Sequence, residues 1–543
     1  MTPATARLVL IGTACFALTA GVMLWRSHAP RDGSDPSGSG VTRGDLFRRT
    51  APAPGRADIP AEPDDHARLL ARLTAPEGAR GARANEAVVT FKDAAALQRF
   101  LAAAAAAGLD VRARIDGLLT VRVAARSAAD LVRGLLPFQS EWSEAGPNPY
   151  VFTPQPPPAE ARATQRHLPF GNRTLEFLGV TGDNAGWGRG VTIAVIDSGV
   201  APDTTFAPGR VRTLDLGLGV QAADGHGTAV AALAAGGSAD APGVAPAASI
   251  LSIRVTDTEG LGDTFTVAQA IVAATDAGAR VLNLSLGAYQ DHPTLSRAVG
   301  YALERGAVVV ASAGNDQAGV LTWPAADPRV ISVGSVDALE QQVTFSNSGE
   351  TLSVTAPGYG VNTAWLENQR VSFSGTSASA PLVAGAIAAV MSQNPGVGAA
   401  GAWEILAAHT NEAGAPGADA RYGQGILNVG WAMARTDPTR VDTAVASHYF
   451  NEAAGRLEVV VQNRSNLGVA GLQLAVQTAA GTSTNTLRWL GPGATSIVTV
   501  PINPSALRSG EVQVFRSELI NPAGVADVAP ANNRKTSSLQ TAP

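Results

Sequence analysis

The sequence predicts an α/β protein, in which a three-layer domain with a mostly parallel sheet follows a small α+β module and precedes a β-sandwich. Short, almost wholly apolar segments such as 191–200 (VTIAVIDSGV) and 306–315 (GAVVVASAGN) alternate with helical segments. Strands that are apolar on both faces are typical of parallel sheets covered by helices on both sides. Residues 456–466 and 511–519 instead alternate with period two, which predicts the sandwich.

Length and composition exclude several classes of protein. The chain has 543 residues, which is too many for one hydrophobic core. Apolar residues make up 45% and charged residues 16%, as in a folded protein. A net charge of -5 argues against a nucleic-acid partner, which needs clustered positive charge. The single cysteine, Cys15, excludes an intramolecular disulfide and a cysteine metal site.

The N-terminus predicts export. Residues 8–25 carry no charge and lie between Arg7 and Arg26. This run is long for a signal-peptide core and just long enough to span a membrane. We therefore assign residues 1–27 to a signal peptide or membrane anchor, and favour a retained anchor. The membrane is then a partner if the segment stays uncleaved, and the protein lies in the cell envelope or is secreted.

A linker and a small module follow. Residues 28–84 are rich in Pro, Gly, Ser, Asp and Arg, which is typical of a flexible linker. Residues 85–155 predict an α+β module with the pattern βαββα. Asp116-Gly117 marks the turn of its hairpin, and Ser127 is positioned to cap its second helix. The expected elements, in order, are a strand, a helix, a hairpin and a helix at residues 86–93, 94–108, 109–125 and 127–138.

Residues 166–435 hold the alternating strands and helices of the central domain, and residues 437–543 form the predicted sandwich. In open parallel sheets, sites lie at the carboxyl ends of the strands. The expected strands of the central domain are 191–200, 280–287, 306–315 and 329–336, and the expected helices include 264–278 and 293–306.

Asp197 and His226 are candidate site residues. Asp197 ends the strand 191–200, where a carboxylate is held rigidly and partly out of water. Asp-Ser-Gly is also a common turn, so Asp197 by itself carries little weight. His226, in the segment DGHGT, begins a helix of small residues that can pack closely against another backbone. No other histidine has a comparable setting.

Ser377 and Asn315 are the other candidates. Ser377 follows Gly375-Thr376 in FSGTSASAP and opens a predicted helix that reaches about Met391. A serine at a helix start is often only a cap, but the N–H groups of that turn can also receive an oxyanion. Asn315 follows an apolar strand, from which its amide can donate to an oxyanion.

Together these residues resemble the subtilisin-like serine proteases (subtilases, peptidase family S8). The matching motifs are VIDSG at Asp197, DGHGT at His226, SAGN at Asn315 and SGTSASAP at Ser377. The resemblance implies that Ser377 attacks a polypeptide substrate, that His226 transfers the proton and that Asp197 orients the imidazole. Asn315 and the Ser377 N–H would bind the oxyanion. Ser374 and Ser379 are then left to backbone support and packing, and no cofactor is implied.

The resemblance also implies two substrate-binding edges, Ser285-Leu286-Gly287 and Gly260-Leu261-Gly262, to which an extended peptide adds as a strand. For Gly260 to Gly262 an ordinary turn is an equal alternative. Residues 231–249 are too short for the calcium loop of the family, so no metal is expected there. The chain also departs from the family at Ala378 and Ser379, where Met-Ala is common, and in HGTAVAA, which lacks a second histidine.

The flanking segments carry weaker resemblances. Residues 85–155 are similar to an inhibitor-type prodomain, whose tail NPYVFTP would lie in the cleft until cut, so that the precursor is latent and processes itself. Residues 437–543 are similar to bacterial adhesion-type Ig-like modules, with a role in binding, spacing or solubility.

The sequence fits two other interpretations less well. A catalytically silent scaffold would be favoured by a missing triad member, and none is missing. An aspartic protease that uses Asp197-Ser198-Gly199 lacks a convincing second motif and leaves Ser377 and His226 unexplained. The expectation is therefore an exported serine endopeptidase made as a self-processed zymogen.

Overall fold

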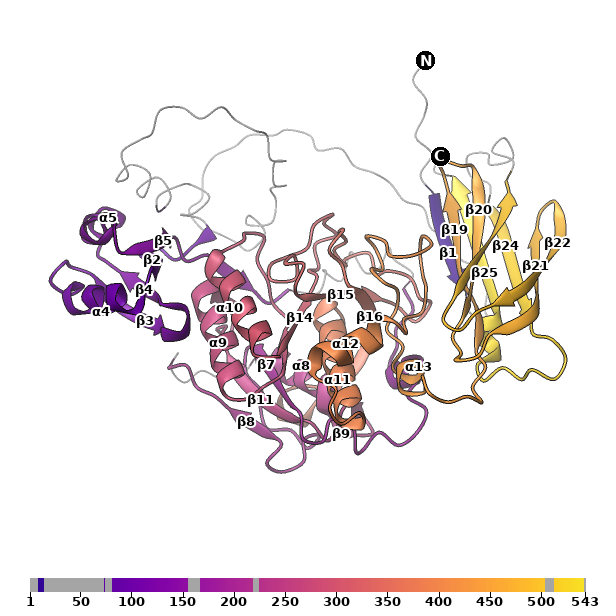
Figure 1. Cartoon of the computed structure of the whole chain (residues 1–543), viewed down its shortest axis with the longest axis horizontal. Coiled ribbons are helices and arrows are strands. Elements are labelled where there is room, and N and C mark those ends of the chain that lie inside the picture. Colours follow the sequence, from indigo (N-terminus) through magenta and orange to yellow (C-terminus); the bar gives the residue numbers. More distant parts are fainter. Residues whose placement is uncertain are drawn as a thin grey trace, which may run out of the picture.

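The computed structural model describes residues 8–13, 73, 81–154, 167–217, 224–502 and 512–541. Figure 1 shows a small N-terminal module, a central α/β body and a C-terminal pair of sheets. The fold class expected from the sequence is thus confirmed.

A seven-stranded sheet with the order β16-β15-β14-β13-β7-β11-β8 forms the central body, and all of its strands are parallel. The four apolar segments of the sequence supply β7, β13, β14 and β15, whereas the sequence pattern did not single out β8, β11 and β16. The strands are β7 (Thr192–Asp197), β8 (Val211–Thr213), β11 (Ser249–Arg254), β13 (Val281–Leu284), β14 (Val308–Ser312), β15 (Ile331–Val336) and β16 (Val354–Pro357).

Helices cover both faces of this sheet. The helices α9 (Thr264–Asp276) and α10 (Pro293–Glu304) pack over the side chains of Ala194 and Ile196. Ile193 and Val195 alternate with them and face the opposite cluster. That cluster contains α8 (His226–Ala235), α11 (Thr376–Gln393), α12 (Ala399–Ala407) and α13 (Val429–Met433).

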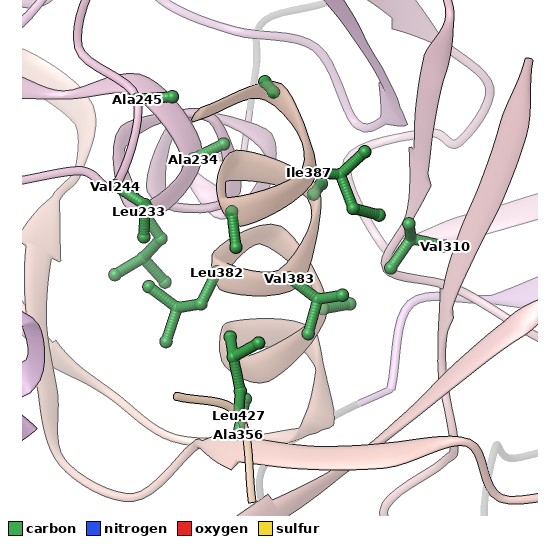
Figure 2. Close-up of a cluster of buried hydrophobic side chains, with 14 of the residues drawn as sticks. Leu233, Ala234, Val244, Ala245, Val310, Ala356, Leu382, Val383, Ile387 and Leu427 are labelled. Atoms are coloured by element: carbon green, nitrogen blue, oxygen red, sulfur yellow. The ribbon is translucent and has the colours of Figure 1, made fainter. Parts of the chain in front are cut away.

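Helix α11 passes through the middle of the larger core. Figure 2 shows Leu382, Val383 and Ile387 of α11 among Leu233 of α8 and Val310 of β14. Every residue of α11 from Thr376 to Val390 is buried. The first turn of this helix is therefore held in place by packing on all sides.

The N-terminal module has a four-stranded sheet, β3-β4-β2-β5, and two helices. The expected cap is confirmed, because Ser127 Oγ accepts a hydrogen bond from Asp130 N at 3.1 Å. A fourth strand, β5, extends the βαββα pattern of the sequence. The elements are β2 (Glu86–Phe91), α4 (Ala94–Ala103), β3 (Asp110–Ile115), β4 (Thr120–Ala124), α5 (Ala128–Leu135), β5 (Trp142–Gly146) and β6 (Tyr150–Phe152), of which β6 leaves the module.

The C-terminal body consists of two antiparallel sheets, β1-β25-β24-β21-β22 and β19-β20-β23, around a shared apolar core. It contacts the central body through polar bonds, including one of 2.8 Å from Lys535 Nζ to Glu340 Oε2 and one of 2.9 Å from Gln462 Nε2 to Thr410 O. The strands are β1 (Leu8–Thr13), β19 (Thr443–Asn451), β20 (Arg456–Asn463), β21 (Val469–Thr478), β22 (Gly481–Leu490), β23 (Thr495–Pro501), β24 (Val512–Ile520) and β25 (Arg534–Thr541).

Most of the predicted signal peptide or anchor lies outside the described residues. Its first part, Leu8–Thr13, forms β1, which pairs antiparallel with β25. Within the part of the chain that the structure describes, no helix is both long enough and apolar enough to cross a membrane. The assignment of residues 1–27 stays a prediction.

Candidate active site

Asp197 and His226 meet at the carboxyl end of the central strand. Asp197 is the last residue of β7 and is fully buried, and its Oδ1 accepts a hydrogen bond from Ser198 N at 2.7 Å. His226 is the first residue of α8, and its Nδ1 lies 2.7 Å from the same carboxylate oxygen. A carboxylate only accepts, so Nδ1 carries the proton and Nε2 is the atom that can take up another. The pair can therefore act as an oriented general base.

Two glycines allow α8 to start at this place. Gly225, the N-cap, has a φ of +90°, and a Cβ there would lie 2.3 Å from the ring of Trp365. A Cβ on Gly227 would lie 2.3 Å from the oxygen of Gly199. Residues with side chains at these positions would push His226 away from the end of β7, so the glycines of the GHG segment set its position.

Ser377 lies in the first turn of α11 and is 1% exposed. Its Oγ donates to Ser285 O at 3.4 Å, and the Oγ of Ser285 donates to Ser377 O at 3.2 Å. Helix α11 packs closely against α8, because a Cβ on Gly385 would lie 2.7 Å from Ala234 O. The close approach expected from the small residues of α8 is thus confirmed.

The other two serines of FSGTSASAP contact backbone groups. Ser374 Oγ accepts a hydrogen bond from Gly360 N at 2.9 Å. Ser379 Oγ lies 3.0 Å from Ala356 O and 2.8 Å from Ser335 Oγ. Both therefore support neighbouring chain segments, as the sequence led us to expect.

Asn315 faces the start of α11 from the end of β14. Its Oδ1 accepts hydrogen bonds from Thr376 N and Thr376 Oγ1, both at 2.9 Å. This fixes the amide so that Nδ2 points toward the place where Gly375 lacks a side chain. A Cβ on Gly375 would lie 2.9 Å from Asn315 Nδ2 and 3.6 Å from Ser377 N. Asn315 Nδ2 and Ser377 N therefore border the same small space, and both are N–H donors of the kind that an oxyanion requires.

The two predicted substrate edges enclose a segment of the chain itself. Strand β12 (Leu261–Asp263) pairs antiparallel with β6, and Leu261 lies opposite Phe152. On the other side Phe152 N donates to Gly287 O at 2.9 Å, and Gly287 N donates to Phe152 O at 2.8 Å. Thr153 N donates to Gly260 O at 2.9 Å. The end of the N-terminal module thus lies between both edges as an added strand.

A polar group follows the edge that ends at Gly287, next to Ala288. Tyr289 OH donates to Asp316 Oδ2 at 2.7 Å and accepts from Asn347 Nδ2 at 2.9 Å. Burial, and then the charge of Asp316, raise the pKa of Tyr289 above its usual range, so the phenol stays protonated.

Residues 231–249, where no calcium was expected, contain the end of α8 and the short hairpin of β9 (Gly237–Ser238) and β10 (Ala241–Pro242). Among the described residues, no three His, Cys, Asp or Glu side chains gather in a group that could hold a metal ion.

Two contributors, Asp224 and Asp263, were not singled out from the sequence. Asp224 accepts hydrogen bonds from His226 N at 2.9 Å and from Ser198 Oγ, and so ties the end of β7 to the start of α8. The sequence feature that could have indicated Asp224 is its position two residues before the start of a helix. Asp263 caps α9 and bonds both Arg83 and Arg122 of the N-terminal module, which no local pattern indicates.

The central body matches known proteins. A model of the subtilase family matches residues 188–425. Subtilisin Savinase of Lederbergia lenta is 35% identical over 254 residues, which cover 44% of this chain and 90% of that protein. Thermitase of Thermoactinomyces vulgaris is 38% identical over 213 residues, 38% of this chain and 76% of that protein. The alkaline protease of Shouchella clausii is 35% identical over 254 residues, and the chain spans 63% of its length.

These matches, with a seven-stranded parallel sheet covered on both faces, define the class of the protein. The chain belongs to the subtilase family of serine endopeptidases. Polypeptides are the substrate class of that family.

Proposed function

We propose that the chain is an exported serine endopeptidase whose triad is Asp197, His226 and Ser377. The observation that carries this proposal is the 2.7 Å contact between His226 Nδ1 and the buried Asp197 carboxylate. It is joined by a buried serine in the first turn of α11, where the N–H groups of a helix can donate to an oxyanion.

The chemistry then runs through an acyl-enzyme. Ser377 Oγ forms a bond to the substrate carbonyl carbon while His226 Nε2 takes its proton. The carbon–nitrogen bond breaks, and His226 returns the proton to the leaving amine. Water repeats the sequence on the ester and releases a carboxylate product. The Asp197 carboxylate orients the imidazole and stabilises the imidazolium, while Asn315 Nδ2 and Ser377 N donate to the oxyanion.

The N-terminal module serves as an intramolecular inhibitor in this proposal, and the precursor is latent until the enzyme processes it. Support comes from β6, which lies between the two substrate edges, and from ion pairs that hold the module. Arg297 Nη2 of α10 bonds Glu144 Oε2 at 2.6 Å, and Arg83 Nε bonds Asp263 Oδ2 at 2.6 Å.

The two ends of the chain bear on where the protein acts and on what it contacts. The uncharged run at residues 8–25 supports export to the cell envelope, with membrane attachment if the segment is retained. The C-terminal sheets would serve in binding or spacing, and their polar contacts with the central body favour a fixed orientation.

Active-site labelling tests the function directly. Full-length protein should acquire the mass of a serine-directed fluorophosphonate during a long incubation, which lets the probe enter whenever β6 leaves the cleft. Ser377→Ala should acquire none. Ser372→Ala, an exposed serine nearby, should label like the parent. A folded parent protein that never labels would instead favour the catalytically silent scaffold.

A further inference from the structure

The strand that lies in the cleft has a defined register. Phe152 and Gly287 exchange both backbone hydrogen bonds, at 2.9 and 2.8 Å. In an antiparallel ladder such doubly bonded pairs recur at every second residue. A ladder that continues past Phe152 in this register has Pro154 opposite Ser285 as its next such pair. Pro154 is a described, partly buried residue that follows Thr153, whose own N–H is already bonded to Gly260 O.

Ser285 is the residue of that edge that contacts the proposed nucleophile. Its backbone oxygen lies 3.4 Å from Ser377 Oγ. The peptide bond that follows residue 154 is therefore the one that this register brings to Ser377. A substrate residue at this position would be fastened by its N–H, which would donate to Ser285 O.

Proline cannot form that bond. It has no N–H, and its ring carbon occupies the place of the hydrogen, so the ring is pushed away from Ser285 O. The fixed φ near -65° also prevents the backbone from adjusting to the extended ladder. The carbonyl of residue 154 then cannot be held in the position for attack, and misplacement by about 1 Å lowers the rate about 10²-fold.

We propose that Pro154 makes the strand that ends the N-terminal module an inhibitor that the enzyme cannot cleave while it is bound. The strand occupies the cleft as a substrate does, but the Pro154–Gln155 bond is not hydrolysed in place, and the first cut in each chain is made by another copy of the enzyme. Each such cut consumes one water, whose oxygen stays on the new carboxylate and whose hydrogen goes to the new amine. This inference rests on the proposed function and adds its mode of regulation.

The rate of processing as a function of protein concentration tests the inference. Wild-type full-length chain should be cut at a rate constant that rises in proportion to its concentration, because the cut is made between molecules. Pro154→Ala should restore the missing N–H and be cut after residue 154 at least about 100-fold faster than that bond is cut in the wild type. Its rate constant should not depend on concentration. Intact-mass spectrometry identifies the bond.

Matched variants isolate the effect. Pro149→Ala is the control, because it also replaces a proline with alanine but at a position that this register does not bring to Ser377. It keeps the backbone oxygen of residue 149, which accepts from Thr264 N at 2.9 Å. This variant should behave as wild type. Ser377→Ala in each background should abolish cutting. Pro154→Leu repeats the test with a larger side chain.

The outcomes separate the inference from the function on which it rests. Cutting of the wild type after Pro154 at a concentration-independent rate overturns the inference. So does a Pro154→Ala protein that labels with a fluorophosphonate but is cut no faster after residue 154. If no variant that retains Ser377 ever labels, the proposed function fails and the inference fails with it.

Discussion

Replacing Asp263 with asparagine should loosen the N-terminal module without unfolding the helix that Asp263 caps. The Asp263 side chain is 2% exposed, and its Oδ2 accepts from Arg83 Nε at 2.6 Å and Arg122 Nη1 at 3.2 Å. Its Oδ1 accepts from Thr266 N at 2.9 Å, a cap that asparagine can also provide. Burial alone raises the pKa of Asp263, but the two arginines outweigh it and leave the pKa lowered. The substitution therefore removes a charge that is present at neutral pH.

The size of the effect follows from the burial of the three side chains. Removing one partner of a buried charged pair costs about 2 to 5 kcal/mol. Arg83 is 38% exposed and can regain water when unpaired, whereas Arg122 is 16% exposed and regains less. The lower part of the range therefore applies. A loss of about 2 to 3 kcal/mol shifts the equilibrium between docked and released module by about 30- to 150-fold.

Hydrogen exchange measures this opening. In a Ser377→Ala background, which prevents cutting, the amides of Phe152 and Thr153 report release because they donate to the two edges of the cleft. Their exchange should accelerate about 30- to 150-fold. Asp116→Asn, whose pairing with Arg114 is exposed, should change it less than about fivefold. Equal exchange in both variants would refute the role of the buried charge.

Two further predictions concern the oxyanion space and the C-terminal sheets. Asn315→Ala should lower kcat about 10²- to 10³-fold with little change in KM, a value measured on the matching asparagine of a subtilisin and carried over. Thr376→Val removes a hydroxyl that bonds Asn315 Oδ1 but keeps the Asn315 side-chain amide. An equal loss of kcat in Thr376→Val would therefore argue that Asn315 has a structural role instead of donating to the oxyanion. Burial, and then Lys535, lower the pKa of His448 to about 3, so the folded sheets bind fewer protons than the unfolded chain. Their stability should be full above about pH 6.5 and fall as the pH drops toward 3, by about 2 kcal/mol at pH 5. Calorimetry at pH 7 and pH 5 measures this fall, which should vanish in His448→Gln.

Elements with a strong local pattern were predicted well. The strands β7, β13, β14 and β15 are mostly apolar because helices cover both of their faces. The strand β22 (Gly481–Leu490) was not predicted, because its residues are mostly polar and exposed. It forms because β21 offers backbone partners along its whole length. Pairing of this kind is made by backbone groups, so the pattern of side chains along the strand does not indicate it.

Some residues of the candidate site were also indicated by the sequence, and others were not. The sequence nominated Asp197, at the end of an apolar strand, and His226, at the start of a helix of small residues. It did not reveal the role of Asp224, because a carboxylate before a helix is usually only a cap. The bonds from Ser198 and His226 to Asp224 exist only once β7 and α8 are packed together.

The sequence by itself determined which residues are apolar, where helices begin and which small residues allow close packing, since these depend on neighbours along the chain. It also showed that a proline follows Thr153. Only the tertiary structure decided that Phe152 pairs with Gly287 and that Arg83 and Arg122 meet Asp263. Register and ion pairing between distant segments depend on how whole domains dock, and the free energy of docking is spread over contacts that no local pattern encodes.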